Sequence, residues 1–293
     1  MSMFKHIVLK TLYVGKHYEI LLLRSNFSNA NNQTVVGKLV KKLPENILHI
    51  EALRNEKCIF EKVQGGPFII KHFSLLEDEE KMLLVVEHLP INDLSVLCDK
   101  NKMTQADVKF FVCEILLGIE HLHKSGVIHK DLKPENIGID KYGHIGIFDF
   151  GLSEFFGPSV RTPFFRNGTD RYMAPEVRNL KVTGYDESLD WWGFGVMLHF
   201  LLVKDYPVFE DPDNQDKLVN PLSHSMVTEE AADLIKKLLK KNPKSRLGGG
   251  GRGAKEIKRH PYFSGVDWKQ VKAREETPPT WCTKALERGK YLF

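Results

Sequence analysis

The densest group of chemically capable side chains lies between residues 129 and 136, where the chain reads His-Lys-Asp-Leu-Lys-Pro-Glu-Asn. Within this string Asp131 can accept a proton, and Lys133 can steady a negative charge. Asn136 and Asp149, which follows Asp131 by 18 residues and begins Asp-Phe-Gly, carry the oxygen ligands that Mg²⁺ prefers. This combination suits the transfer of a charged group between two bound reactants.

These two strings, in this order, resemble the catalytic loop and the metal-binding motif of the protein kinase family. The alternative, a chance polar loop on the surface, does not account for both motifs occurring together. The resemblance implies that Asp131 is the catalytic base for a Ser or Thr hydroxyl and that Lys133 steadies the transferred phosphoryl group. It also implies that Asn136 and Asp149 hold Mg²⁺ on the phosphates of ATP, so ATP and Mg²⁺ are the expected cofactors.

A lysine and a glutamate upstream resemble the ion pair that orients ATP in this family. Lys38 ends the string Val36-Gly37-Lys38, which is similar to the third strand of a kinase, and Glu56 lies in the helical segment that follows. The resemblance implies that Lys38 touches the α and β phosphates and that Glu56 fixes its side chain. The alternative is two ordinary surface charges, because such residues are mostly exposed.

Downstream strings narrow the resemblance to the AGC group of Ser/Thr kinases, which includes protein kinase A. They are Asp190-Trp191-Trp192-Gly193, Arg246-Leu247-Gly248 and His260-Pro261-Tyr262-Phe263, and the similarity runs from about residue 4 to residue 279. Lys133 and Leu152 are typical of Ser/Thr rather than Tyr kinases. Glu176 and Arg246 match a family ion pair, which we expect to be buried and structural.

The sequence pattern changes near residue 89, which predicts two lobes. Before it lie short β-branched runs and one helical segment between about residues 52 and 63. After it, apolar residues recur every three or four positions between residues 108 and 122, and residues 191–203 are apolar on nearly all sides. We therefore expect an α+β, bilobal protein kinase fold. Its parts would be a small β-rich N-lobe with one main helix (4–89), a larger helical C-lobe (90–263) and an AGC-like C-terminal tail (264–293).

The expected glycine-rich turn over the phosphates is altered. Only Gly15 of the three family glycines is present, and Tyr13 and Tyr18 stand at the flanking positions. Glycine there lets backbone N–H groups approach phosphate closely, so the turn would be an eroded phosphate cradle with weaker ATP binding. Alternatively, the two rings form a different cover that excludes water from the cleft.

The adenine slot is altered as well. Val36 replaces the small alanine usual above adenine, and Gly138 replaces the leucine usual below it. The two changes either compensate for each other or reflect relaxed selection on binding. Residues 87–89 resemble the hinge, whose backbone reads adenine. The residues expected at the ATP site are Gly15, Ile20, Val36, Lys38, Glu56, Glu87, Leu89 and Asp93.

The activation segment departs from the AGC pattern at two linked positions. Phe165 stands where those kinases carry the phosphorylated threonine, and Lys130 replaces the arginine that receives the phosphate. Lysine cannot reproduce the bidentate fork of arginine. We therefore expect activity that does not depend on phosphate at this position, with Ser159 and Thr162 as alternative phosphorylation sites. Thr169 is expected to support Asp131 by hydrogen bonding, as its family counterpart does.

The favoured interpretation is a protein Ser/Thr kinase that uses Mg-ATP. The alternative is a pseudokinase acting as a binding or scaffolding module, which the altered glycine-rich turn favours; a small-molecule kinase fits the AGC-like strings poorly. Asp93 and Glu135 match positions that receive an arginine ahead of the phosphoacceptor, whereas Phe200 stands near a second expected acid. We therefore expect protein substrates with Ser/Thr acceptors and a weak preference for basic residues.

Composition restricts partners and compartment. The 293 residues are 42% hydrophobic and 27% charged, which is enough for a substantial core. A net charge of +4 is too small and dispersed to predict binding to nucleic acid or anionic membranes. The four cysteines lack metal-ligand spacing, and no stretch reaches the roughly 18 apolar residues of a membrane span. We expect an intracellular, cytoplasmic monomer without a signal peptide; a nuclear location is also compatible.

Overall fold

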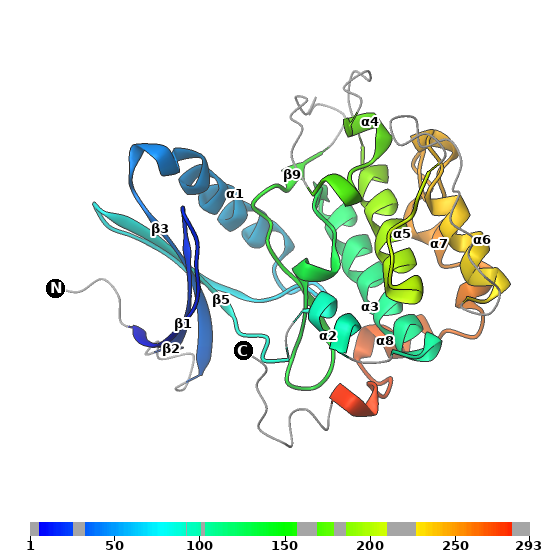
Figure 1. Cartoon of the computed structure of the whole chain (residues 1–293), viewed down its shortest axis with the longest axis horizontal. Coiled ribbons are helices and arrows are strands. Elements are labelled where there is room, and N and C mark those ends of the chain that lie inside the picture. Colours follow the sequence, from blue (N-terminus) through cyan, green and yellow to red (C-terminus); the bar gives the residue numbers. More distant parts are fainter. Residues whose placement is uncertain are drawn as a thin grey trace.

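A computed structural model of the chain describes residues 6–25, 33–91, 93–100, 103–156, 169–178, 186–209 and 227–282. It has a small lobe built on a sheet and a larger helical lobe (Figure 1). The small lobe is a five-stranded antiparallel sheet in the order β1-β2-β3-β5-β4. Its strands are β1 His6–Val14, β2 Glu19–Ser25, β3 Thr34–Lys41, β4 His72–Glu77 and β5 Lys81–Glu87.

One long helix, α1 Ile47–Val63, packs on this sheet and follows directly from a 3₁₀ turn, Pro44–Asn46. The helix begins earlier than the predicted start near residue 52. Ile47 and Leu48 in its first turn are 58% and 73% exposed, so no buried apolar pattern marks this turn in the sequence. The residues that it buries are Ile50, Leu53, Glu56, Ile59, Phe60 and Val63.

Residues 69–73, one of the short β-branched runs before residue 89, are divided between the two lobes. Strand β4 begins only at His72. Ile69 instead forms a bridge with Ile147 of the large lobe, and the backbone N–H of Ile70 donates to the Ile147 carbonyl at 3.2 Å. These bonds join the segment after α1 to the large lobe.

The large lobe is helical, as its apolar periodicity predicted. Its longest helix, α3 Gln105–Lys124, begins at a capping box formed by Thr104 and Asp107. Thr228 caps α6 by accepting a hydrogen bond from the Ala231 N–H at 3.2 Å. The helices of this lobe are α2 Leu94–Lys100, α3, α4 Pro175–Arg178, α5 Ser188–Val203, α6 Glu229–Leu238, α7 Gly253–Ile257 and α8 Trp268–Ala273.

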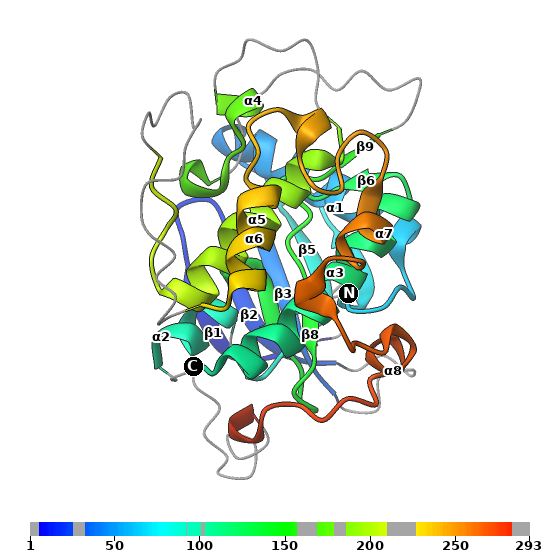
Figure 2. The ribbon, with the colours of Figure 1, turned by 90° about the vertical axis from the view of Figure 1, so that its right-hand side faces the viewer.

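Helix α5 is buried along almost its whole length, and α6 lies beside it (Figure 2). Four short strands and several 3₁₀ turns carry the polar strings next to this helical core. The strands are β6 Val127–Ile128, β7 Ile137–Ile139, β8 Ile145–Ile147 and β9 Glu154–Phe155, and the turns are Pro134–Asn136, Asp170–Tyr172, Pro243–Ser245 and Pro261–Phe263. Strand β6 pairs with β9, and β7 pairs with β8.

The predicted fold class, a bilobal α+β protein kinase fold, is confirmed by this arrangement. The boundaries 4–89, 90–263 and 264–293 remain predictions. None of the helices in the described part of the chain has the length and apolar character needed to cross a lipid bilayer.

Candidate active site

Helix α5 fixes the backbone of the catalytic loop, residues 129–136. The buried Asp190 accepts hydrogen bonds from the backbone N–H groups of His129 and Lys130, both at 2.9 Å, and lies 2.8 Å from His123 Nε2. Burial by itself would raise the pKa of Asp190, but its contact with His123 and these N–H groups hold that pKa below the usual value. The loop is therefore anchored by a buried carboxylate anion.

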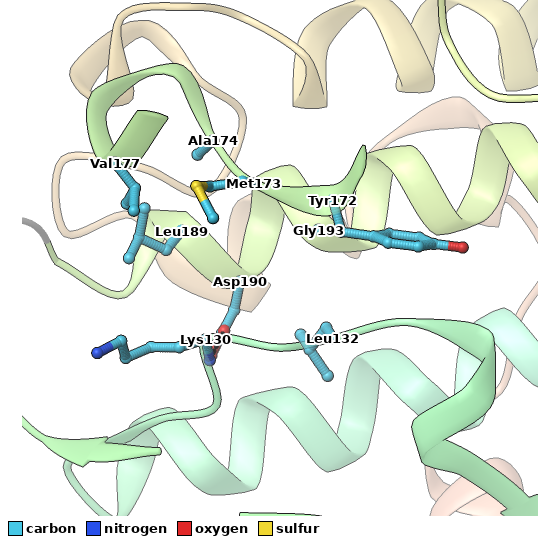
Figure 3. A pocket seen from close by; sticks show the side chains of 9 residues that line it. All are labelled: Lys130, Leu132, Tyr172, Met173, Ala174, Val177, Leu189, Asp190 and Gly193. Carbon is cyan, nitrogen blue, oxygen red and sulfur yellow. Dashed lines mark hydrogen bonds between the residues drawn. The ribbon is translucent and has the colours of Figure 1, made fainter. Parts of the chain in front are cut away.

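A small cavity of about 20 Å³ lies between the catalytic loop and α5, which is room for about one water molecule. In Figure 3 Asp190 points from α5 towards the loop backbone, whereas the Lys130 side chain extends away from the other lining residues. The lining residues come from the catalytic loop, from residues 172–177 and from α5, so these three segments meet here.

Both oxygens of the Asp131 carboxylate have partners. Oδ1 accepts from the N–H and hydroxyl of Thr169 at 3.0 and 2.9 Å. Oδ2 lies 2.6 Å from Lys133 Nζ and 3.2 Å from Asn136 Nδ2. Lys133 also donates to the Thr169 hydroxyl at 2.8 Å. The predicted catalytic residues Asp131 and Lys133 are thus brought together, with Thr169 joining them as expected.

Of the two predicted metal ligands, Asn136 ends the catalytic loop and Asp149 follows strand β8. Asn136 donates its amide N–H to the Asp131 carbonyl at 2.8 Å, so its amide oxygen is the atom left for a cation. Asp149 has a positive φ of 63° and a side chain that is 41% exposed, unlike the buried Asp131. This backbone conformation is uncommon for a non-glycine residue and turns the carboxylate towards the cleft side that carries Lys38.

Lys38 bridges the two lobes through carboxylates. Its Nζ lies 3.0 Å from Asp149 Oδ1 and 3.5 Å from Glu56 Oε2. Glu56 is buried and also accepts the backbone N–H of Phe150 at 3.0 Å. Burial would lower the pKa of Lys38, but the charges of Glu56 and Asp149 outweigh it and raise that pKa. For Asp149, the charge of Lys38 outweighs burial and lowers the pKa, so this pair is charged.

The predicted hinge leucine, Leu89, lies against two glycines of the large lobe. Gly138 and Gly146 face each other across β7 and β8, and the Leu89 side chain lies over both. A Cβ on Gly138 would lie 2.5 Å from Leu89 Cδ1, and one on Gly146 would lie 3.1 Å from it. Leu89 therefore occupies the space that a side chain at Gly138 would take, a contact that the sequence analysis missed. The compensation between Val36 and Gly138 remains a prediction.

Of the other predicted ATP-site residues, two lie in the sheet and two lie outside its centre. Ile20 pairs with Lys38, and Val36 pairs with Val86, so both lie on the central strands of the sheet. Glu87 is bonded twice to Lys71: its carboxylate accepts the Lys71 N–H at 3.0 Å, and its own N–H donates to the Lys71 carbonyl at 2.8 Å. Asp93 caps α2 through Ser95 and Val96, and the structure shows no contact between it and the Lys38 cluster.

Lys130 has an internal partner, which the sequence analysis missed. Its side chain is only 3% exposed and forms an ion pair with Glu154 of β9, the strand that pairs with β6 beside the catalytic loop. Pairing of β6 with β9 places these residues together, although 24 positions separate them in the sequence. Phe165, Ser159 and Thr162 lie outside the described residues.

The expected structural pair of Glu176 and Arg246 is present. Arg246 is fully buried and meets the Glu176 carboxylate with two bonds, of 2.7 and 2.9 Å. Its guanidinium also lies 5.2 Å from the Trp192 ring centroid, so it joins α4 to α5.

Comparison with known proteins agrees with this geometry. Residues 23–263 match the protein kinase domain family. The chain is 36% identical over 278 residues to ribosomal protein S6 kinase 2 alpha of Gallus gallus, covering 93% of this chain and 36% of that protein. It is 35% identical over 279 residues to ribosomal protein S6 kinase 2 beta of Xenopus laevis, covering 93% and 44%. For ribosomal protein S6 kinase alpha-3 of Homo sapiens the identity is 36% over 278 residues, covering 93% and 37%.

The chain therefore belongs to the protein kinase domain family. Its similarity to ribosomal S6 kinases confirms the predicted resemblance to AGC Ser/Thr kinases. It spans between 36% and 44% of the length of these relatives. The family match begins at residue 23, after the altered turn at residues 13–18.

Proposed function

We propose that this chain is an active kinase domain that transfers the γ-phosphate of ATP to Ser and Thr hydroxyls of proteins. The observation that carries the proposal is the position of Asp131, whose carboxylate is held by Thr169, Lys133 and Asn136. Titratable side chains with specific charged partners gather at functional sites, and Asp131 contacts two of the other candidate residues, Lys133 and Asn136.

In this proposal Asp131 accepts the proton of the substrate hydroxyl. The hydroxyl oxygen forms its bond to the γ-phosphorus as the bond to the bridging oxygen breaks, and ADP leaves. Lys133, at 2.6 Å from Asp131, is placed to neutralise charge on the transferred group. Lys38, held by Glu56, positions the α and β phosphates.

The donor atoms of Asn136 and Asp149 suit Mg²⁺. One amide oxygen and one partly exposed carboxylate are hard oxygen ligands, and Mg²⁺ commonly takes one or two such groups together with phosphate oxygens. When bound, Mg²⁺ would neutralise phosphate charge. The chain orients the two ligands: Asp131 holds the Asn136 amide, and Lys38 holds the Asp149 carboxylate.

We propose a weak preference for basic residues in protein substrates. Glu135 is exposed on the catalytic-loop turn and can meet an arginine. Oδ1 of Asp93 already accepts hydrogen bonds from the Ser95 N–H and hydroxyl, at 2.9 and 2.5 Å. Less of its carboxylate therefore remains for a substrate arginine. We also propose an intracellular setting, because none of the four cysteines, all of which lie in the described part of the chain, forms a disulfide.

The scaffolding alternative depends on the altered turn alone. The relatives named above are kinases by name, and every charged position of the proposed machinery is present.

The test is transfer of labelled phosphate from ATP to a mixed peptide library, with Asp149→Ala as the blank. We expect label on Ser and Thr acceptors with wild-type protein and none with the variant. Equal signals from both proteins, or label confined to Tyr, would overturn the proposal.

A further inference from the structure

The turn over the ATP site, residues 15–18, is closed by its own backbone and by an aromatic ring. The Gly15 N–H donates to the Tyr18 carbonyl at 2.9 Å. The Tyr13 ring lies against Gly15 so closely that a Cβ there would be 2.6 Å from Tyr13 Cε1. A side chain at residue 15 would therefore have to displace the Tyr13 ring from its present position.

Two histidines connect this turn to α1. The rings of His17 and His49 stack with centroids 4.5 Å apart and an interplanar angle of 14°. His17 Nδ1 also lies 2.9 Å from the side-chain oxygen of Asn46, and the Asn46 amide donates to the Lys41 carbonyl at 3.0 Å. Asn46 is 3% exposed, so this connection has a buried anchor next to the first turn of α1.

Tyr18 joins the stack to Lys38. Its ring lies 5.5 Å from Tyr13, 6.3 Å from His49 and 5.6 Å from Lys38 Nζ. His49 and Glu56 are seven residues apart on α1, which places them on the same face, two turns from each other. The turn, Lys38 and the helix that carries Glu56 are thus joined by side chains.

Two charged imidazoles would repel each other in such a stack. Burial lowers the pKa of His49 from its usual value, and the neighbouring His17 and Lys38 lower it further. The ring of His49 is therefore uncharged at neutral pH, and like-charge repulsion does not separate it from His17.

We propose that Tyr13, His17, Tyr18 and His49 form an aromatic latch that positions the turn over the ATP phosphates, in place of the missing glycines. The latch residues are positioning residues. They hold the turn against α1, so nucleotide binding and the placement of Glu56 are coupled. The latch rests on the proposed function in one respect: residues 15–18 are taken to cover the phosphates of bound ATP.

The latch and the eroded cradle predict opposite changes in Mg-ATP affinity when the two tyrosines are replaced. Replacing Tyr13 and Tyr18 together by glycine should weaken Mg-ATP binding, because the turn loses its contacts with Lys38 and α1. An eroded cradle would instead bind Mg-ATP more tightly after the same change, since backbone N–H groups would regain access to phosphate.

The experiment is calorimetric binding of Mg-ATP and of adenosine, which has no phosphates, to the full chain. His17→Ala and His49→Ala should each weaken Mg-ATP binding about threefold to tenfold and leave adenosine binding unchanged. His49→Phe, which keeps a stacking ring, should restore most of the affinity. The matched control is His72→Ala, because His72 stacks on Phe60 at the other end of α1 and should affect neither ligand.

Unchanged Mg-ATP affinity in both histidine variants would overturn the latch. So would equal losses for adenosine, which would indicate general damage to the fold, or tighter Mg-ATP binding by the double glycine variant. The readout is binding, so a protein that binds Mg-ATP but transfers no phosphate would contradict the proposed function and leave the latch standing.

Discussion

At the scale of single residues, the two acidic side chains of the cleft differ in exposure. Asp131 is buried and has hydrogen-bonding partners on both oxygens, whereas the Asp149 side chain is 41% exposed and touches Lys38. Loss of charge at Asp149 should therefore affect chemistry more than folding.

We predict that Asp149→Asn abolishes phosphate transfer and leaves thermal stability near that of the wild type. The lost charge faces the cleft rather than the core, and a neutral amide is a poorer ligand for a divalent cation. Labelled-ATP assays and thermal melting measure the two effects. Transfer that survives above a few per cent of wild type would remove Asp149 from its proposed role.

The position of Leu89 gives a second residue-scale prediction. Gly138→Leu should weaken ATP binding, because its side chain must displace Leu89, whose Cδ1 lies 2.5 Å from the Cβ position. The double variant Gly138→Leu with Leu89→Ala moves the leucine back to β7 and should recover most of the affinity. Titration with Mg-ATP measures both. Additive losses in the double variant would show that Leu89 does not fill this space for the nucleotide.

At the scale of elements, the pairing of β6 with β9 provides the counter-charge for Lys130. A buried ammonium is costly without a partner, and Glu154 supplies one from within the chain. The first part of the activation segment is therefore held next to Asp131 by an internal carboxylate.

We predict that protein made in bacteria and treated with phosphatase is as active as untreated protein.

In contrast, Glu154→Gln should lower activity and reduce the free energy of unfolding by about 1–3 kcal/mol, because Lys130 loses its charged partner. Exchange of the two residues, Lys130→Glu with Glu154→Lys, should recover part of the loss. Strong inactivation by phosphatase would indicate that a residue such as Thr162 or Ser159 carries the switch.

The pair that joins α4 to α5 predicts a large effect on stability. Arg246→Ala should lower the free energy of unfolding by about 3–5 kcal/mol, since Glu176 is left buried and unpaired. The control is Arg54→Ala, whose side chain is 55% exposed and pairs with Glu77, and which should cost at most about 1 kcal/mol. Denaturant titration compares them. Similar losses in both variants would contradict a special role for burial.

At the scale of the whole molecule, the sequence was sufficient to predict the two lobes and the residues that meet in the cleft. Two short strings, whose residue types and order resemble one family, contain Asp131, Asn136 and Asp149. Lys38 and Glu56 were located by their resemblance to a strand lysine and a helix glutamate of the same family. Helical periodicity located α3, and a run that is apolar on nearly all sides located α5, because both helices are largely buried.

The contacts that distinguish this chain could not be read from local pattern. His17 meets His49, and Leu89 meets Gly138 and Gly146, only after the sheet and the hinge are folded. The pairing of Lys130 with Glu154 depends in the same way on the register of β6 and β9. No periodicity marks such pairs, because each partner is an ordinary residue in its own segment.

The most direct test of the central claim is single-turnover transfer of labelled phosphate by unphosphorylated protein, compared with Asp131→Asn. We predict transfer to a Ser/Thr peptide by the wild type. We predict that the variant binds Mg-ATP normally and loses at least about a hundredfold in rate, in line with the loss of a general base. A wild-type protein that binds Mg-ATP but transfers no more phosphate than Asp131→Asn would contradict the claim and identify the chain as a binding module.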